Sequence, residues 1–357
     1  MRLKEFKAEL AKKGVDFAVF LNLDTTKLDP NLFYFSGFEG IGALIVPKNK
    51  KPFLVVPLME YERAKKSEMK VYALKKKKKL FESVADIIKK NKIRPKKIGI
   101  DKDSLTLRQY KGFKKHFRKS KTVDVSGVCF ELREIKTNDE LKRIKKACAI
   151  SDKILKKCFS RFKKFKTESE VAAFLEYETK KLGCGLAFQP IVASGRAGSM
   201  SHYTPKNIRL RGGFCVIDFG VRYEGYCSDT TRIIFIGKPS EKQKMIYESV
   251  LRNQLEAIKN IKKDMECSKV VELVKKGLGK YEKNFIHGLG HGLGVYIHEL
   301  PNLKEESRDK LKKGMVFTIE PGIYFEKKFG IRIEDTIYLK DKPIVLTKIP
   351  KRMVVIS

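Results

Sequence analysis

Three of the chain's five histidines lie in one glycine-rich stretch, FIHGLGHGLGVYIHELP, which runs from residue 285 to residue 301. His287 and His291 are four residues apart, a spacing that can hold zinc on one face of a helix. That motif also needs a glutamate directly after the first histidine, whereas Gly288 follows here. Four glycines within seven residues disfavour a helix by roughly 1 kcal/mol each. We therefore predict a loop or an irregular strand, and carboxylates from elsewhere should complete any metal site.

Two aspartates lie eleven residues apart in VIDFGVRYEGYCSDTTR. The turn expected over residues 222–225 has its centre between Tyr223 and Glu224, and so does the pair formed by Asp218 and Asp229. A hairpin closed there would place the two aspartates directly opposite each other, with Cβ atoms about 4.5–5.5 Å apart. Two like charges at that distance repel each other, so the pair predicts a cation between them.

A second pair of carboxylates occurs in TIEPGIYFEKKFGIRIED. Glu320 and Glu334 are symmetric about Lys327, so a hairpin closed at that residue would again bring two carboxylates face to face. Apolar neighbours on both sides predict that these glutamates are not simply solvated. Acidic strand residues are usually just exposed, and a glycine-rich turn can carry incidental histidines. The two pairs and the histidine cluster together are nevertheless best explained by a metal site.

Four carboxylates and one imidazole form an oxygen-rich donor set with a single nitrogen. Such a set suits two divalent ions, with manganese or cobalt expected first and zinc as an alternative, better than one structural zinc. Two metal ions about 3.5–4 Å apart lower the pKa of a bound water to about 7 and stabilise a tetrahedral intermediate. The residues therefore predict hydrolysis by a metal-bridging hydroxide.

The bulk composition is that of an ordinary soluble globular protein, with 42% apolar and 34% charged residues. A length of 357 residues suggests two domains. The N-terminal residues lack the apolar core of a signal peptide, and no stretch approaches the ~18 apolar residues of a membrane span. Seven cysteines without a CxxC pair favour reduced thiols. We therefore expect a cytoplasmic protein without a membrane partner.

The formal net charge of +36 is the unusual feature of the composition. It raises the possibility of a nucleic-acid partner, and the run Lys75–Lys79 could bind phosphates. However, lysine is spread along the whole chain, with little arginine and no aromatic–basic motif. We interpret the charge mostly as solvated surface and do not expect nucleic acid as the partner.

The expected elements divide the chain into domains of residues 1–125 and 126–357. In the first, β-rich runs alternate with helix-like segments at 80–90 and 104–117, which is typical of a small α/β domain. His116 lies there and is expected at the surface. In the second, helices are expected to begin near Thr137, Thr167 and Ser240 and to span residues 268–278. They should flank a mainly antiparallel sheet, which gives an α+β domain.

The motifs DFG, SDTTR, HGLGHGLG, TIEPG and RIED resemble those of the pita-bread metallopeptidases. That family includes methionine aminopeptidases, aminopeptidase P and Xaa-Pro dipeptidase (prolidase). The resemblance implies a C-terminal pita-bread catalytic domain with an antiparallel sheet and flanking helices. It also implies a creatinase-like α/β N-terminal domain, which NLFYFSGF at residues 31–38 resembles. Methionine aminopeptidases generally lack this domain, so the likeness favours the proline-specific branch.

The resemblance also implies which residues bind the ions. The family's ordered metal ligands fall on Asp218, Asp229, His291, Glu320 and Glu334. By this likeness Asp229 and Glu334 bridge both ions and Asp218 chelates one. His291 and Glu320 hold the other, and Glu320 also handles the proton of the nucleophilic water.

Further residues take roles from the same resemblance. His298, in HELP, resembles the histidine that stabilises the intermediate, and His202, in SMSHYTP, resembles one that contacts the surroundings of the scissile peptide. Arg332 is expected to orient metal ligands through hydrogen bonds without binding the metal itself, and His287 is expected to shape the pocket. Many relatives, dipeptidases among them, carry an arginine shortly after the HExP motif, where it can meet the substrate's C-terminal carboxylate. Here Asn302 stands in that segment.

The resemblance implies hydrolysis of Xaa-Pro bonds in small proline-containing peptides by a homodimer. We expect an Xaa-Pro dipeptidase, with an Xaa-Pro aminopeptidase that acts on longer peptides as the alternative. Two hypotheses of other classes are an inactive relative that binds nucleic acid through its basic surface and a creatinase-like hydrolase that works without metal. The intact set of five ligands argues against both.

Overall fold

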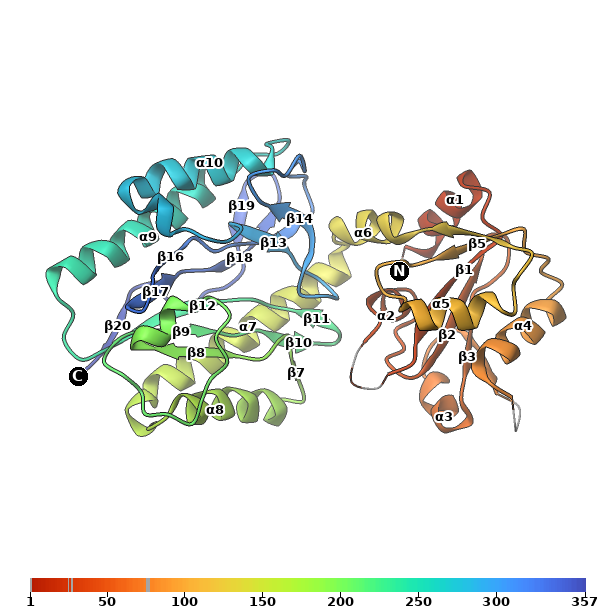
Figure 1. Cartoon of the computed structure of the whole chain (residues 1–357), viewed down its shortest axis with the longest axis horizontal. Helices are drawn as coiled ribbons and strands as arrows, with labels where there is room; N and C mark the ends of the chain where they lie inside the picture. Colours follow the sequence, from red (N-terminus) through yellow and green to blue (C-terminus); the bar gives the residue numbers. More distant parts are fainter. Residues whose placement is uncertain (1, 25, 27, 75–77) are drawn as a thin grey trace. The chain divides into compact units, whose positions relative to one another are not determined.

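The computed structural model describes residues 2–24, 26, 28–74 and 78–357, and the chain forms two compact units, Met1–Leu132 and Arg133–Ser357 (Figure 1). Helix α6 (Ser126–Glu134) begins at the predicted domain boundary, and the two units divide near its end. Residues 75–77 of the lysine run considered for phosphate binding lie outside the described residues. Among the helices in the described ranges, none is long and apolar enough to cross a membrane.

The first unit is built around one six-stranded sheet in the order β4-β3-β2-β1-β5-β6. β2 pairs antiparallel with β1 and with β3, and the remaining neighbours are parallel. The strands are β1 (Phe17–Asn22), β2 (Gly42–Pro47), β3 (Phe53–Val56), β4 (Lys70–Ala73), β5 (Lys97–Ile100) and β6 (Lys121–Asp124). The helices are α1 (Leu3–Lys12), α2 (Pro30–Ser36), α3 (Tyr61–Ala64), α4 (Leu80–Lys90) and α5 (Leu107–Lys114), with the 3-10 turn η1 (Leu58–Glu60).

Helices cover both faces of this sheet, which explains the continuous apolar run of β1. Phe17 lies in a buried cluster with Phe113 of α5. Phe20 points to the other face, where its ring is 5.7 Å from that of Phe6 in α1 and 5.4 Å from that of Phe35 in α2. A strand buried on both faces needs apolar residues at every position rather than at alternate ones. The predicted α/β character of this domain is confirmed.

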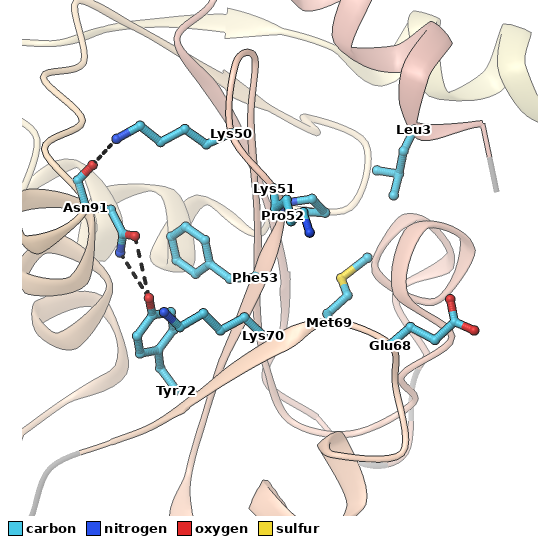
Figure 2. Close-up of a pocket in the computed structure, with 10 residues that line it drawn as sticks. All are labelled: Leu3, Lys50, Lys51, Pro52, Phe53, Glu68, Met69, Lys70, Tyr72 and Asn91. Carbon is cyan, nitrogen blue, oxygen red and sulfur yellow. Dashed lines mark hydrogen bonds between the residues drawn. The ribbon is translucent and has the colours of Figure 1, made fainter.

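A pocket of about 310 Å³ opens in the first unit beside β3 and β4 (Figure 2). Its lining combines the rings of Phe53 and Tyr72 with three lysines. The Tyr72 hydroxyl lies 3.4 Å from the amide nitrogen of Asn91. None of the predicted metal ligands lines this pocket. All five predicted ligands belong instead to the second unit.

The helices of the second unit begin where the sequence predicted. Thr137 and Glu140 form a capping box at the start of α7 (Asn138–Ser160), because each side chain accepts a hydrogen bond from the other residue's backbone N–H. Ser240 opens α9 (Glu241–Asn260) in the same way, and Thr167 caps α8 (Glu168–Lys181). α10 spans Cys267–Leu278. The 3-10 turns are η2 (Phe162–Lys164), η3 (Gly195–Ser199) and η4 (Gly279–Asn284).

Two larger sheets of the second unit carry the predicted site. The first has the order β20-β12-β9-β8 and is antiparallel except between β12 and β20. Its strands are β8 (Ile191–Ser194), β9 (Gly213–Asp218), β12 (Thr231–Ile236) and β20 (Val354–Ile356). The second has the order β14-β13-β15-β18-β19. Its strands are β13 (Gly290–Gly292), β14 (Glu299–Leu303), β15 (Val316–Ile319), β18 (Asp335–Leu339) and β19 (Pro343–Val345).

Two smaller groups of strands complete this unit. A hairpin is formed by β16 (Gly322–Phe325) and β17 (Phe329–Arg332). A three-stranded group has the order β11-β10-β7, with β7 (Gly185–Leu186), β10 (Val221–Tyr223) and β11 (Tyr226–Cys227). The pairs are antiparallel. The predicted, mainly antiparallel α+β domain is thus confirmed.

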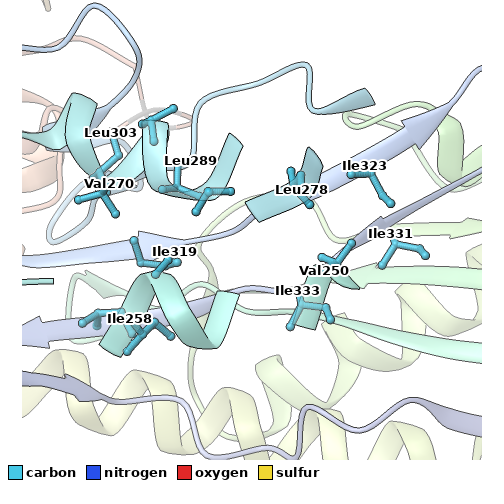
Figure 3. Close-up of a cluster of buried hydrophobic side chains, with 14 of the residues drawn as sticks. Val250, Ile258, Val270, Leu278, Leu289, Leu303, Ile319, Ile323, Ile331 and Ile333 are labelled. Carbon is cyan, nitrogen blue, oxygen red and sulfur yellow. The ribbon is translucent and has the colours of Figure 1, made fainter. Parts of the chain in front are cut away.

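Alternation along β9 produces two cores. Phe214 and Val216 pack in a cluster with α9 and α10, whereas Cys215 and Ile217 pack in a cluster with α7 and α8. Members of the first cluster labelled in Figure 3 are Val250, Ile258, Val270, Leu278, Leu289, Leu303, Ile319, Ile323, Ile331 and Ile333. Burial of one such aliphatic side chain contributes roughly 1.5–3 kcal/mol. The helices thus hold rigid the strands whose ends carry the predicted ligands.

Candidate metal centre

The five predicted metal ligands lie at or near strand ends of the second unit. Asp218 is the last residue of β9, and His291 is the middle residue of β13. Glu320 directly follows β15, and Glu334 directly precedes β18. Asp229 lies between β11 and β12. Strand ends can direct polar groups into a site while the rest of each strand stays in the apolar core.

The first predicted hairpin is wrong by two residues. Asp218 pairs with Thr231 and not with Asp229. The turn lies at Glu224 and Gly225, which both have positive φ, 45° and 82°. A two-residue hairpin turn of the favoured type needs positive φ at both central positions, and glycine adopts it without strain. The glycine therefore moves the centre of the hairpin past the point of symmetry between the two aspartates.

The second predicted hairpin is confirmed. β16 pairs with β17 about Lys327, and β15 pairs with β18 in the same register. Glu320 and Glu334 consequently occupy opposite positions at the break between these two ladders. Lys327 itself has a positive φ of 57°, at the tip of the turn.

Ligand atoms from three separate segments converge in a candidate metal site. One ligand atom each of Asp229, His291 and Glu334 lies within 4.8 Å of the other two. The His291 Nε2 atom is 3.5 Å from Asp229 Oδ2 and 3.4 Å from Glu320 Oε1. Asp218 is close enough for its charge to raise the pKa of Asp229 and of Glu334. The structure thus brings together all five residues that the sequence proposed as ligands.

The glycines around His291 allow its strand to lie between two others. A Cβ atom on Gly290 would come within 2.1 Å of the Thr318 carbonyl oxygen, and one on Gly292 within 2.0 Å of the Leu300 carbonyl oxygen. Only glycine permits such close backbone approach. This approach is the structural reason for the glycine-rich stretch and for the irregular strand that it was predicted to form.

The electrostatics of the cluster favour a bound cation. Burial, followed by the charges of neighbouring carboxylates, raises the pKa of Asp229 and of Glu334 well above the usual range. Burial lowers the pKa of His291, which favours its neutral imidazole. The His291 Nδ1 atom is 3.1 Å from the Gly292 carbonyl oxygen. A proton on Nδ1 would donate to that carbonyl, and Nε2 would keep its lone pair for a metal ion.

Three buried carboxylate oxygens fit divalent cations. In the described part of the chain, no group forms a hydrogen bond with Asp218 Oδ1, Asp229 Oδ1 or Glu334 Oε1. A buried polar atom without a partner is costly. In two of these carboxylates the second oxygen accepts a hydrogen bond from the protein. Thr231 Oγ1 donates to Glu334 Oε2 at 2.6 Å, and Arg332 Nη2 donates to Asp218 Oδ2 at 2.6 Å. These oxygen donors therefore fit the divalent metal ions that the sequence predicted.

Arg332 contacts several of these groups from the end of β17. Besides Asp218, its guanidinium donates from Nε to Thr231 Oγ1 at 3.1 Å and from Nη1 to the Tyr324 hydroxyl at 2.9 Å. The Tyr324 hydroxyl is 3.0 Å from His287 Nε2. Burial, and then the charge of Arg332, lowers the pKa of His287 to about 4. His287 is therefore linked to the cluster through Tyr324 and Arg332.

His298 and His202 approach the cluster from two further loops. The ring centroids of His298 and His291 are 4.4 Å apart, with the rings tilted by 71°. Burial, and then the proximity of His291 and His202, lowers the pKa of His298 to about 4. His202 lies in the turn after η3. The exposed His116 belongs to the first unit, and its predicted place at the surface is confirmed.

Thr231 and Thr318 contact predicted ligands, and Tyr324 contacts Arg332 and His287, but none of the three was found from the sequence. Thr318 Oγ1 donates to Glu320 Oε1 at 3.1 Å. Thr231 could have been found, because it follows Asp229 closely in the motif SDTTR. Tyr324 has no local signal, because its role depends on contacts with segments 8 and 37 residues away.

Comparison with known proteins agrees with this geometry. The sequence profile of metallopeptidase family M24 matches residues 142–341, and that of the creatinase/prolidase N-terminal domain matches residues 2–135. The Xaa-Pro dipeptidase of Pyrococcus furiosus is 39% identical over 319 residues, which are 87% of this chain and 88% of that protein. The prolidase structure from Pyrococcus horikoshii OT3 has a TM-score of 0.88 at 33% identity and covers 99% of both chains. The X-Pro aminopeptidase structure from Thermotoga maritima MSB8 has a TM-score of 0.88 at 30% identity, covering 96% of this chain and 98% of that one.

Proposed function

This chain belongs to metallopeptidase family M24, and from that premise we propose that it is an Xaa-Pro dipeptidase. Its first unit is a creatinase-type α/β domain, and its second is a pita-bread catalytic domain. The observation that carries the proposal is the convergence of Asp229, His291 and Glu334 within 4.8 Å, in a chain 39% identical to a Xaa-Pro dipeptidase. An Xaa-Pro aminopeptidase remains the second candidate, because a solved structure of that activity has the same fold.

We infer that Asp218, Asp229, His291, Glu320 and Glu334 hold two divalent ions, manganese or cobalt first and zinc as an alternative. When bound, such ions supply Lewis-acid chemistry, which activates water and polarises the scissile carbonyl. Three buried carboxylate oxygens with no partner among the described groups support this assignment.

The remaining steps belong to side chains of the protein. Burial raises the pKa of the Glu320 carboxyl, so Glu320 can accept a proton from the attacking water and return it to the leaving proline nitrogen. His298 is neutral at pH 7, because its pKa is lowered to about 4, and it can donate a ring N–H to the developing oxyanion. His202 lies near enough to His298 and Glu320 to influence their pKa values, and we propose that it holds the peptide beside them. Arg332 keeps Asp218 in place and does not itself react.

Substrate length is decided by what meets the substrate's C-terminal carboxylate. Asn302 stands opposite His291 across the β13–β14 pair, close to the metal ligands. An amide cannot bind a carboxylate with the paired N–H groups of an arginine. We therefore propose that the enzyme cleaves Xaa-Pro dipeptides and also Xaa-Pro-Yaa tripeptides to a detectable extent.

The test compares kcat/KM on Leu-Pro and Leu-Pro-Gly in the unmodified enzyme and in Asn302→Arg. We expect the arginine to shift the ratio towards the dipeptide. Chelation should abolish both activities, and manganese or cobalt should restore them. Full activity after verified metal removal would contradict the proposed chemistry. Strict dipeptide selectivity in the unmodified enzyme would show that another residue binds the carboxylate.

We also propose that the enzyme is a homodimer, by analogy with the branch that its sequence resembles. Sedimentation at several protein concentrations measures this directly, and a monomer at micromolar concentration would contradict it.

A further inference from the structure

A buried charge cluster lies directly behind His298, and the proposed chemistry does not use it. Glu299, the first residue of β14, has a side chain that is 1% exposed. Its Oε1 atom is 3.0 Å from Arg133 Nε, and its Oε2 atom is 3.2 Å from Lys136 Nζ. Both cations are also buried, with side chains 3% and 2% exposed. One buried carboxylate therefore forms ion pairs with two buried cations.

Such a cluster is not explained by stability alone. Charges removed from water lose their solvation, and their mutual attraction offsets much of that loss. A buried ion pair is therefore often no more stabilising than apolar residues of the same size. What a buried pair does provide is a fixed location for its members. Arg133 and Lys136 lie just before α7, more than 160 residues from Glu299 along the chain. The cluster thus ties the segment that precedes α7 to the loop that carries His298.

The position of Glu299 constrains the position of His298. His298 is the last residue of the bend that precedes β14, and its backbone is joined directly to that of Glu299. Because Arg133 and Lys136 hold the Glu299 side chain, the backbone next to His298 has a fixed place. From that place the His298 ring lies 4.4 Å from the ring of the proposed metal ligand His291. The strand ladder contributes as well, because Glu299 pairs with Gly292, the residue after His291.

Gly294 makes room for this carboxylate. A Cβ atom on Gly294 would come within 2.4 Å of Glu299 Oε2. The backbone of the same loop also holds Glu299, because the Tyr296 N–H donates to Oε1 at 3.2 Å. Arg133, Lys136 and the Tyr296 N–H thus fix both oxygens of the Glu299 carboxylate. Gly294, which has no side chain, leaves the space that this carboxylate occupies.

We propose that Glu299, held by Arg133 and Lys136, is a positioning residue that fixes the His298 imidazole beside the metal ligands. The proposal rests on the proposed peptidase function, in which His298 contacts the reacting peptide. Glu299 acts only through His298 and touches neither the substrate nor the ions. Its loss should lower kcat, because a misplacement of about 1 Å in a reacting group can cost about 10²-fold.

The test begins with Glu299→Gln, which keeps the size of the side chain and removes its charge. We expect kcat on Leu-Pro to fall by about 10- to 100-fold, with KM changed less than about twofold and the metal content unchanged. In a His298→Ala background, the same substitution should change kcat by less than about twofold, because the group on which it acts is absent. Glu305→Gln is the matched control, since Glu305 forms an exposed ion pair with Lys275 and should leave kcat unchanged.

A second variant perturbs the cluster without changing any charge. Gly294→Ala places a methyl group against Glu299 Oε2 and should reproduce the loss of kcat, with no further loss when combined with Glu299→Gln. This variant also covers the case in which Glu299→Gln fails to fold. Crystal structures of both variants should show the His298 ring displaced relative to His291.

Two results would overturn the proposal. One is an undiminished effect of Glu299→Gln in the His298→Ala background, which would mean that Glu299 acts elsewhere. The other is an unmoved His298 ring in the variant crystals. The crystallographic result needs no substrate, so it tests the positioning even if the unmodified protein hydrolyses no Xaa-Pro peptide. That last outcome would contradict the proposed function instead.

Discussion

At the scale of single residues, the site depends on how the two oxygens of a proposed carboxylate ligand are used, one by a hydrogen bond to the protein and the other by a cation. Glu334 accepts a hydrogen bond from Thr231 on one oxygen, and Asp218 accepts one from Arg332, while the other oxygen of each is buried and has no partner in the described part of the chain. A cation is the group that satisfies such oxygens together and cancels their mutual repulsion. The types and order of the proposed ligands could be read from the sequence, because two pairs of carboxylates and a histidine cluster stand out in a chain with few histidines. Their supporting hydroxyls could not, because Thr231 and Tyr324 acquire their role only from distant partners.

The first prediction concerns the proposed bridging ligands. Asp229→Ala and Glu334→Ala should each remove at least one ion from the purified protein, because each is proposed to bind both ions. Metal analysis of dialysed protein measures the stoichiometry. Asp341→Ala is the control, since this exposed carboxylate pairs with Lys313 and is not a proposed ligand. Two ions retained in either site variant would contradict the proposed geometry.

His298→Ala should lower kcat by roughly 10²–10³, the range for loss of one hydrogen-bond donor to a developing oxyanion. The metal content should stay the same, because His298 is not proposed as a ligand. Steady-state kinetics and metal analysis on the same preparation separate the two effects. The exposed His116 provides the control, and His116→Ala should change no kinetic parameter. A variant that lost metal would place His298 among the ligands.

The pH dependence of the metal-free protein follows from the raised pKa values. In the folded state, burial and neighbouring carboxylates raise the pKa of Asp229 and of Glu334 above the value of about 4 expected in the unfolded chain. Between those values the folded state binds more protons than the unfolded state. The free energy of unfolding must therefore fall as pH rises from about 4 through the raised pKa values.

The measurement is urea unfolding of metal-free protein from pH 5 to pH 8. Unmodified protein should lose stability across this range more steeply than Asp229→Asn, in which one of the repelling charges is absent. Both proteins have the same basic surface, so its contribution to the pH dependence of the free energy of unfolding cancels in the comparison. Equal slopes in the two proteins would show that the carboxylates do not repel one another as the structure indicates.

At the scale of the elements, the site depends on strand register. The hairpin at Lys327 could be predicted from symmetry because its odd-numbered polar turn has one clear centre. The hairpin at Glu224 and Gly225 could not, because the positive φ that the turn requires outweighs the symmetry of the aspartates. Helix starts were predictable, since a capping box such as that of Thr137 is a local signal. The break between the two ladders at Glu320 arises from long-range pairing and has no such signal.

The glycines of β13 give the prediction at this scale. In Gly290→Ala the new methyl group would lie 2.1 Å from the Thr318 carbonyl oxygen, so β13 and β15 must separate. We expect a loss of about 1–3 kcal/mol in the free energy of unfolding and weaker metal binding through His291. Urea unfolding and metal titration measure the two effects. Gly127→Ala is the control, since in the described residues no atom beyond its own helix and chain neighbours lies within 4 Å of its Cβ position. Unchanged metal affinity in Gly290→Ala would contradict the argument.

At the scale of the whole molecule, the chain consists of two units with separate cores. The cluster around Phe17 and Phe113 belongs to the first unit, and those on either side of β9 belong to the second. This division could be predicted from the change in patterning along the chain. The net charge of +36 adds nothing to either core, because charged side chains are almost never fully buried unless paired. All five proposed ligands lie in the second unit.

Because the proposed ligands all lie in one unit, thermal unfolding can test whether metal ions stabilise that unit and not the other. A ligand that binds only the folded second unit stabilises that unit by about 2.7 kcal/mol when its concentration is 100 times its dissociation constant. For a unit of this size, such a gain raises the unfolding temperature by roughly 5–10 °C. Calorimetry of the full chain should therefore show two transitions, of which manganese raises one and leaves the other in place. Asp229→Ala should abolish the shift without moving the transition that manganese does not affect. A single transition that moved as a whole would show that the two units unfold as one cooperative body.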